Sequence, residues 1–98
     1  MNRIKQIDIQ TLLESLPAYG TAQTNVYTKA ITAPYTDWIW YPTEYDKENN
    51  ICFGLVDGWE LEMGDFSITE MLEVFENLSC YEIEPITFGQ IEDEKGGF

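Results

Sequence analysis

The chain has 98 residues, of which 44% are hydrophobic and 14% are aromatic, and its formal net charge is −13. This length corresponds to one domain, and the aromatic content is too high for an acidic disordered chain. The negative charge disfavours direct binding to nucleic acid or to anionic membranes and favours basic protein surfaces.

The first half of the chain predicts one helix and two strands. The spacing of apolar residues indicates a helix over residues 8–17, with Asp8 as its N-cap. β-Branched and aromatic residues indicate strands over residues 24–33 and 37–45, followed by a polar turn at residues 46–50. The strand over 24–33 could be an unpaired sheet edge that dimerises, so both a monomer and a homodimer stay open.

A hairpin is the clearest local signal in the sequence. Two apolar runs, residues 51–56 and 59–63, are separated by the dipeptide Asp57-Gly58, which is typical of a two-residue type I′ turn. Such a turn would place Val56 opposite Trp59. The first run is apolar on both faces, which predicts a central strand.

The last third of the chain predicts a helix over residues 67–77, opened by a capping box of Ser67 and Glu70. An extended segment follows over residues 81–91. The fold class that we expect is α+β: a four-stranded antiparallel meander sheet with an N-terminal helix and a helix after strand four, both helices covering one face. The domain would span residues 1–91, with an acidic flexible tail over residues 92–98.

No targeting segment is recognisable. Polar residues between Gln6 and Gln10 interrupt any apolar run, and no stretch reaches the length of a transmembrane helix. We therefore expect a cytoplasmic protein with no membrane partner. Cys52 and Cys80 are then expected to be reduced, and Cys52 to be a small core residue.

Two longer motifs resemble a known family. They are the run from Trp38 to Asp46, WIWYPTEYD, and the run from Phe53 to Ser67, FGLVDGWELEMGDFS. Together they are similar to the domain of unknown function 2958 family, small bacterial proteins of plasmids and conjugative elements. The similarity runs from Leu12 to about Phe88, and Asp65 stands where that family usually has an aromatic residue. The resemblance implies a mobile-element context and no particular activity.

No catalytic constellation stands out. The chain has no His, no phosphate-binding glycine pattern and no Cys cluster, so we predict no catalytic residue, no cofactor and no metal site. The carboxylate pairs Glu44 with Asp46 and Glu60 with Glu62 keep a carboxylate-metal enzyme open as an alternative. The predicted hairpin would place Glu60 and Glu62 on the sheet face opposite Val56.

The tryptophans allow two interpretations. Trp38 and Trp40 share one face of their strand, either as core anchors or as an exposed aromatic platform. A platform for stacking bases would need surrounding Lys and Arg, whereas the neighbours here are acidic. An aromatic patch with an acidic rim suits a basic protein partner.

Residues 1–30 carry three basic and two acidic side chains, and residues 31–98 carry two basic and sixteen acidic ones. The leading hypothesis is an acidic interaction module of a mobile element that mimics nucleic acid and inhibits a host nuclease or another nucleic-acid-binding protein. The alternative is an accessory module that binds through an aromatic surface. The candidate partner-binding residues are Trp38, Trp40, Tyr41, Glu44, Asp46, Glu60, Glu62, Glu70 and Glu73.

Overall fold

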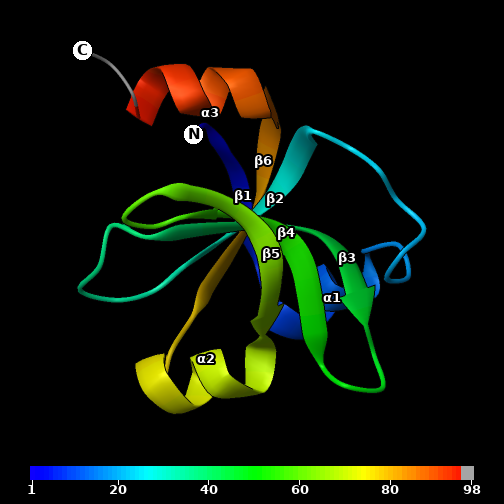
Figure 1. Ribbon diagram of the computed structural model, residues 1–98. Coiled ribbons are helices and arrows are strands. Elements are labelled where there is room, and N and C mark those ends of the chain that lie inside the picture. The colour runs from blue at the N-terminus through cyan, green and yellow to red at the C-terminus, as the bar shows by residue number, and fades with distance from the viewer. Residues whose placement is uncertain (96–98) are drawn as a thin grey trace.

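A computed structural model describes residues 1–95 as one six-stranded sheet with three helices (Figure 1). Every neighbouring strand pair is antiparallel, in the order β1-β6-β2-β3-β4-β5. The strands are β1 (Arg3–Ile7), β2 (Val26–Thr32), β3 (Ile39–Asp46), β4 (Ile51–Asp57), β5 (Leu61–Ser67) and β6 (Ser79–Thr87). The helices are α1 (Ile9–Glu14), α2 (Ile68–Phe75) and α3 (Phe88–Lys95). The α+β class is confirmed, but the predicted count of four strands is wrong.

The β4–β5 hairpin has a different turn from the predicted one. Asp57 pairs with Leu61, so three residues form the loop. A type I′ turn needs positive φ at both central residues, and neither residue of the Asp57-Gly58 dipeptide is among the described residues with positive φ. The register shifts by an odd number of residues, which moves each β5 side chain to the other face of the sheet. Val56 therefore opposes Glu62, and the predicted pairing is wrong.

The sheet is wider than predicted because it includes β1 and β6. β1 is exposed at four of its five positions, so it lacks the apolar alternation by which a strand is recognised. β6 pairs with β1 on one side and with β2 on the other. The strand predicted over 24–33 is therefore inside the sheet and is not an edge through which the chain could dimerise. The edges are β1 and β5.

Capping residues open α1 and α2 as predicted. The Asp8 carboxylate accepts a hydrogen bond of 2.7 Å from the Thr11 backbone N–H, and this bond lowers the pKa of Asp8. The Ser67 hydroxyl accepts one of 3.2 Å from the Glu70 backbone N–H. α2 ends at Phe75, slightly earlier than expected.

Within residues 1–95, no helix is long and apolar enough to cross a membrane.

α3 was not predicted, although a second capping box opens it. The Thr87 hydroxyl accepts from the Gln90 backbone N–H at 3.1 Å, and the Gln90 side-chain oxygen accepts from the Thr87 backbone N–H at 2.9 Å. Residues 92–95 of the predicted flexible tail belong to this helix, so that part of the prediction is wrong. The other tail residues, 96–98, lie outside the described part of the chain.

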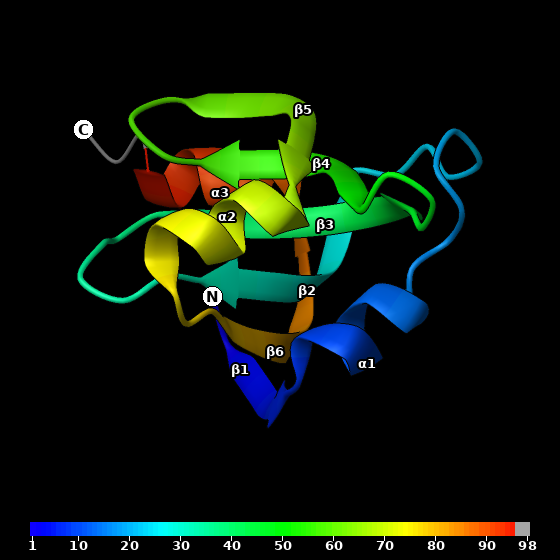
Figure 2. The ribbon, with the colours of Figure 1, turned by 90° about the horizontal axis from the view of Figure 1, so that it is seen from below.

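Helices cover both faces of the sheet, whereas the sequence predicted helices on one face only. Figures 1 and 2 show α3 on one side of the strands, and α1 and α2 on the other. Each face has its own core. The core of the α1/α2 face includes Leu12, Ile31, Trp40, Ile68 and Met71. The core of the α3 face includes Tyr27, Tyr41, Leu55, Ile83 and Ile91.

Both cysteines are buried and unbonded in the core of the α1/α2 face, which confirms Cys52 as a core residue. Burial raises the pKa of Cys52 to about 12 and that of Cys80 to about 11. Since only thiolates react readily, these side chains remain inert thiols at neutral pH.

Candidate protein interface at one end of the sheet

Two loops that are far apart in the sequence meet at one end of the sheet, which we call the loop end. Residues 33–38 join β2 to β3, and residues 58–60 join β4 to β5. Ile39 pairs with Thr32 on one side and with Asp57 on the other, so both loops leave the sheet at the same end. The C-terminal part of α2 lies beside the first loop.

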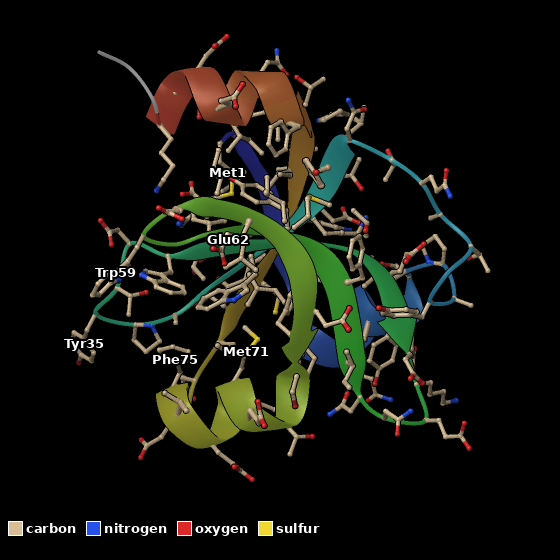
Figure 3. All side chains as sticks on the ribbon, in the orientation of Figure 1. Met1, Tyr35, Trp59, Glu62, Met71 and Phe75 are labelled. Carbon is tan, nitrogen blue, oxygen red and sulfur yellow. The ribbon has the colours of Figure 1, made fainter. Side chains whose placement is uncertain are left out.

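Large apolar side chains are exposed at the loop end. Tyr35, Trp59 and Val74 have relative accessibilities of 105%, 88% and 71%. Figure 3 shows Tyr35, Trp59 and Phe75 on the same side of the molecule. One exposed apolar residue is ordinary, but a group of them on one part of a surface is typical of an interaction site.

Neither Tyr35 nor Val74 is predicted to be a site residue from the sequence. Tyr35 lies in a loop whose sequence lacks the alternation of apolar and polar residues that is typical of a strand. Val74 is outside the apolar face of its helix. The only available signal was that each is a large apolar residue at a position with no place in a predicted core.

The backbone at this end adopts conformations that are unfavourable for ordinary residues. Tyr35 has φ 64°, and Glu76, which follows α2, has φ 60° and ψ −51°. The Asn77 N–H donates to the Phe75 carbonyl at 2.5 Å, which makes Glu76 the centre of a γ-turn of the positive-φ type. Such residues cost about 1–3 kcal/mol each and cluster at functional sites. These residues border a hollow of about 400 Å³.

Trp40, which lies in β3, and Trp38, which precedes this strand, have different environments. Trp40 is 5% exposed and packs against Phe75 at a ring-centroid distance of 5.6 Å, so it is a core anchor. Trp38 is half-buried, with its ring centroid 5.9 Å from that of Trp40. A Cβ at Gly58 would lie 2.7 Å from the Trp38 ring. Gly58 is therefore needed for this packing and not for a type I′ turn.

A hollow of about 290 Å³ lies between Trp38 and the β4–β5 loop, and we call it the Trp38–Trp59 pocket. The observed hairpin register places Glu62 opposite Val56, and therefore on the sheet face that carries Trp38. The predicted register would have placed the glutamates on the other face. The pocket is lined by Trp38, Val56, Gly58, Trp59, Glu60 and Glu62.

Lys95, the last residue of α3, holds the base of this loop. Its ammonium group donates to Asp57 Oδ1 and to the Gly58 carbonyl, both at 2.7 Å. The Lys95 and Asp57 side chains are 32% and 17% exposed, so the pair is partly shielded from water. The loop that carries Trp59 is thus tied to a helix on the other face of the sheet.

Three of the predicted partner-binding residues do not belong to the loop end. Tyr41 is 2% exposed in the core of the α3 face, and burial raises its pKa to about 12. Glu44 is 4% exposed and accepts hydrogen bonds from the Gly20 and Ala22 backbone N–H groups. Asp46 accepts from backbone N–H groups of its own turn.

Burial therefore removes Tyr41 and Glu44, as well as Trp40, from any surface that could contact a partner.

Within residues 1–95, no group of three or more Cys, Asp or Glu side chains is placed to hold a metal ion.

Most of the acidic side chains are exposed and lack a basic partner. Fourteen of the eighteen are exposed, Glu70 and Glu73 on α2 among them, and only Glu44 is buried. Three ion pairs form within residues 1–95, and one of these uses the terminal amino group. Two of the five basic residues, Arg3 and Lys5, lie on β1, at the sheet edge opposite β5. The loop end and β5 are therefore dominated by negative charge.

A larger and mainly apolar hollow of about 580 Å³ lies between α1, α2 and the β3–β4 turn. Ile9, Leu13, Leu16 and Leu72 supply much of its apolar lining. Nothing in its lining resembles a catalytic or metal-binding arrangement.

Comparison of the chain with protein-family models, with curated proteins and with solved structures gives no match. The resemblance to the domain of unknown function 2958 family therefore stays a prediction.

Proposed function

We propose that this protein is a small acidic interaction module that docks on a basic surface of a partner protein. The partner surface would be one that otherwise binds nucleic acid, so that docking and nucleic-acid binding compete. A host nuclease is a partner of suitable chemistry if the chain is encoded on a mobile element, as the family resemblance implies.

One observation carries this proposal: fourteen of eighteen acidic side chains are exposed, and few are neutralised within the described residues. Uncompensated charge of one sign weakens the compact state through self-repulsion. A basic partner relieves that repulsion when it docks. Carboxylates of this protein would then bind the Lys and Arg side chains of the partner that normally contact phosphates.

The test is affinity capture from a bacterial lysate at low and at high salt, followed by reconstitution with the purified partner. We expect a nucleic-acid-binding protein that is released at high salt, because about 1 M salt screens exposed charges beyond about 3 Å. Adding this protein should displace DNA or RNA from that partner. The double variant Glu70→Gln/Glu73→Gln should weaken the displacement by up to about thirtyfold, since exposed charges contribute up to about 1 kcal/mol each.

The variant Glu84→Gln, at an exposed acid on β6, is the matched control for the removal of charge at another site. A partner that is retained equally at both salt concentrations and does not bind nucleic acid would contradict the proposal.

The exposure of Tyr35, Trp59 and Val74 favours a second candidate, an accessory module that binds through its aromatic surface. Binding would then be insensitive to salt. Tyr35→Ala and Trp59→Ala should each abolish it without changing the free energy of unfolding, because neither side chain contributes to a core.

A further inference from the structure

We propose that the Trp38–Trp59 pocket receives one arginine side chain of the basic partner. This inference rests on the proposed function and makes it more specific, because it assigns one residue type to one site.

The size of the pocket suits a single side chain. Its volume of about 290 Å³ is at the lower limit of ligand pockets, which hold about 300–1,000 Å³. It is open on one side, where Trp59 is 88% exposed. A side chain that projects from a partner could enter the pocket beside Trp59 without any opening of the fold.

The lining of the pocket selects a cation. Two indole side chains line the pocket, and tryptophan attracts cations more strongly than the other aromatic residues do. Glu60 and Glu62 add two carboxylates, and neither takes part in an ion pair within residues 1–95. A neutral or anionic group would gain nothing from the carboxylates and would leave them desolvated.

The geometry favours arginine over lysine. A guanidinium group is planar, stacks on aromatic rings and binds carboxylates through two parallel hydrogen bonds, whereas an ammonium group is a compact and strongly hydrated charge. This chain uses its own cations in the same way. The Arg3 guanidinium lies 4.2 Å from the Tyr81 ring centroid, while Lys95 binds oxygen atoms of Asp57 and Gly58.

Lys95 also keeps the pocket available. It satisfies Asp57, the nearest partly buried carboxylate, and leaves Glu60 and Glu62 free to bind a cation from outside. Since Gly58 both packs under Trp38 and accepts from Lys95, the loop has a defined position before any ligand arrives. A preformed site loses less conformational entropy on binding.

The experiment is an NMR titration of the full chain with three short peptides: acetyl-Gly-Gly-Arg-Gly-Gly-amide, its lysine counterpart and its citrulline counterpart. Citrulline has the shape of arginine without the charge. We expect the indole N–H signals of Trp38 and Trp59 to shift with the arginine peptide while that of Trp40 stays in place. Affinity should be lower by about tenfold for citrulline and by a few-fold for lysine, given the usual strengths of such contacts.

Variants locate the binding. Trp59→Ala and Glu62→Gln should each weaken binding of the arginine peptide by about fivefold or more. Ile4→Ala and Glu84→Gln are the controls, an exposed apolar residue on β1 and an exposed acid on β6, both outside the pocket, and should leave the affinity unchanged. Trp59 and Glu62 are both exposed, so their replacement does not threaten folding.

Equal affinity for the arginine and citrulline peptides would overturn the inference, as would an unchanged affinity in Trp59→Ala. Equal affinity for arginine and lysine would overturn the choice of arginine. If the peptide does not bind while a basic partner is still captured at low salt, only the pocket assignment fails. If the peptide binds in the pocket and the captured partner never competes with nucleic acid, the proposed function fails instead.

Discussion

Glu44 is the one acidic side chain that the fold buries, and we expect its replacement to destabilise the whole domain. It is 4% exposed on β3, and its carboxylate accepts hydrogen bonds from the Gly20 N–H at 3.1 Å and the Ala22 N–H at 2.5 Å. These bonds hold the connection between α1 and β2 against the sheet. From the sequence, Glu44 is predicted to bind a partner, and this role and the structural role lead to different experimental results.

The expected magnitude follows from the two bonds. A hydrogen bond to a charged group stabilises a protein by about 1.5–3 kcal/mol. Glu44→Ala removes both bonds and leaves two backbone N–H groups without this acceptor, so the free energy of unfolding should fall by about 3–6 kcal/mol. Glu44→Gln keeps one acceptor oxygen and should cost about 1–2 kcal/mol. Losses of this size are large for a domain whose total stability is about 5–15 kcal/mol.

The assay is urea unfolding followed by tryptophan fluorescence, with amide hydrogen exchange measured at Gly20 and Ala22. Glu62→Gln is the control, because that carboxylate is exposed and accepts no backbone hydrogen bond from residues 1–95. Both Glu44 variants should also speed exchange at these two amides. A free energy of unfolding within about 0.5 kcal/mol of the parent protein for Glu44→Ala would refute the reasoning.

Three further predictions concern the core, the pH dependence and the loop end. Gly54→Ala should lower the free energy of unfolding by about 1–3 kcal/mol, because a Cβ there would lie 2.9 Å from a backbone atom of β3; Gly64→Ala, in open space, should change it little in the same denaturation experiment. Burial raises the pKa values of Cys52 and Cys80 to about 12 and about 11, so the folded state keeps protons that the unfolded chain releases. That stability is fully present below about pH 9 and is lost as the pH rises towards 12; a variant with alanine at both positions should show a smaller loss in unfolding experiments between these pH values. Lys95→Met should lower the free energy of unfolding by up to about 1 kcal/mol at low salt and by less at high salt, and no difference at low salt would contradict the importance of that ion pair.

The parts of the fold that local signals could predict are those with a strong pattern of their own. Asp8 and Ser67 open helices because their side chains accept hydrogen bonds from free N–H groups of the first turn. These bonds are local and do not depend on the rest of the fold. β2, β3 and β4 carry enough β-branched and aromatic residues to be recognised without a partner. The capping box of Thr87 and Gln90 is a local signal of the same kind for the start of α3.

The candidate site was harder to predict because it depends on pairing. Trp38, Glu60 and Glu62 were selected from the sequence, but the predicted turn put the glutamates on the wrong face of the sheet. Trp40 was selected with Trp38, yet only packing against α2 shows that it is a buried anchor.

The amino-acid sequence by itself determined the acidic surface, the α+β class and the helix starts, because these depend on composition and on neighbours within one turn. Only the tertiary structure decided the width of the sheet, since β1 has no apolar face and exists because β6 offers it a partner. It also decided which acids are structural and which are exposed: Glu44 faces two backbone donors, and Glu62 faces solvent beside Trp38. Side chains that look alike in sequence thus acquire different roles because burial and strand register are properties of the whole fold.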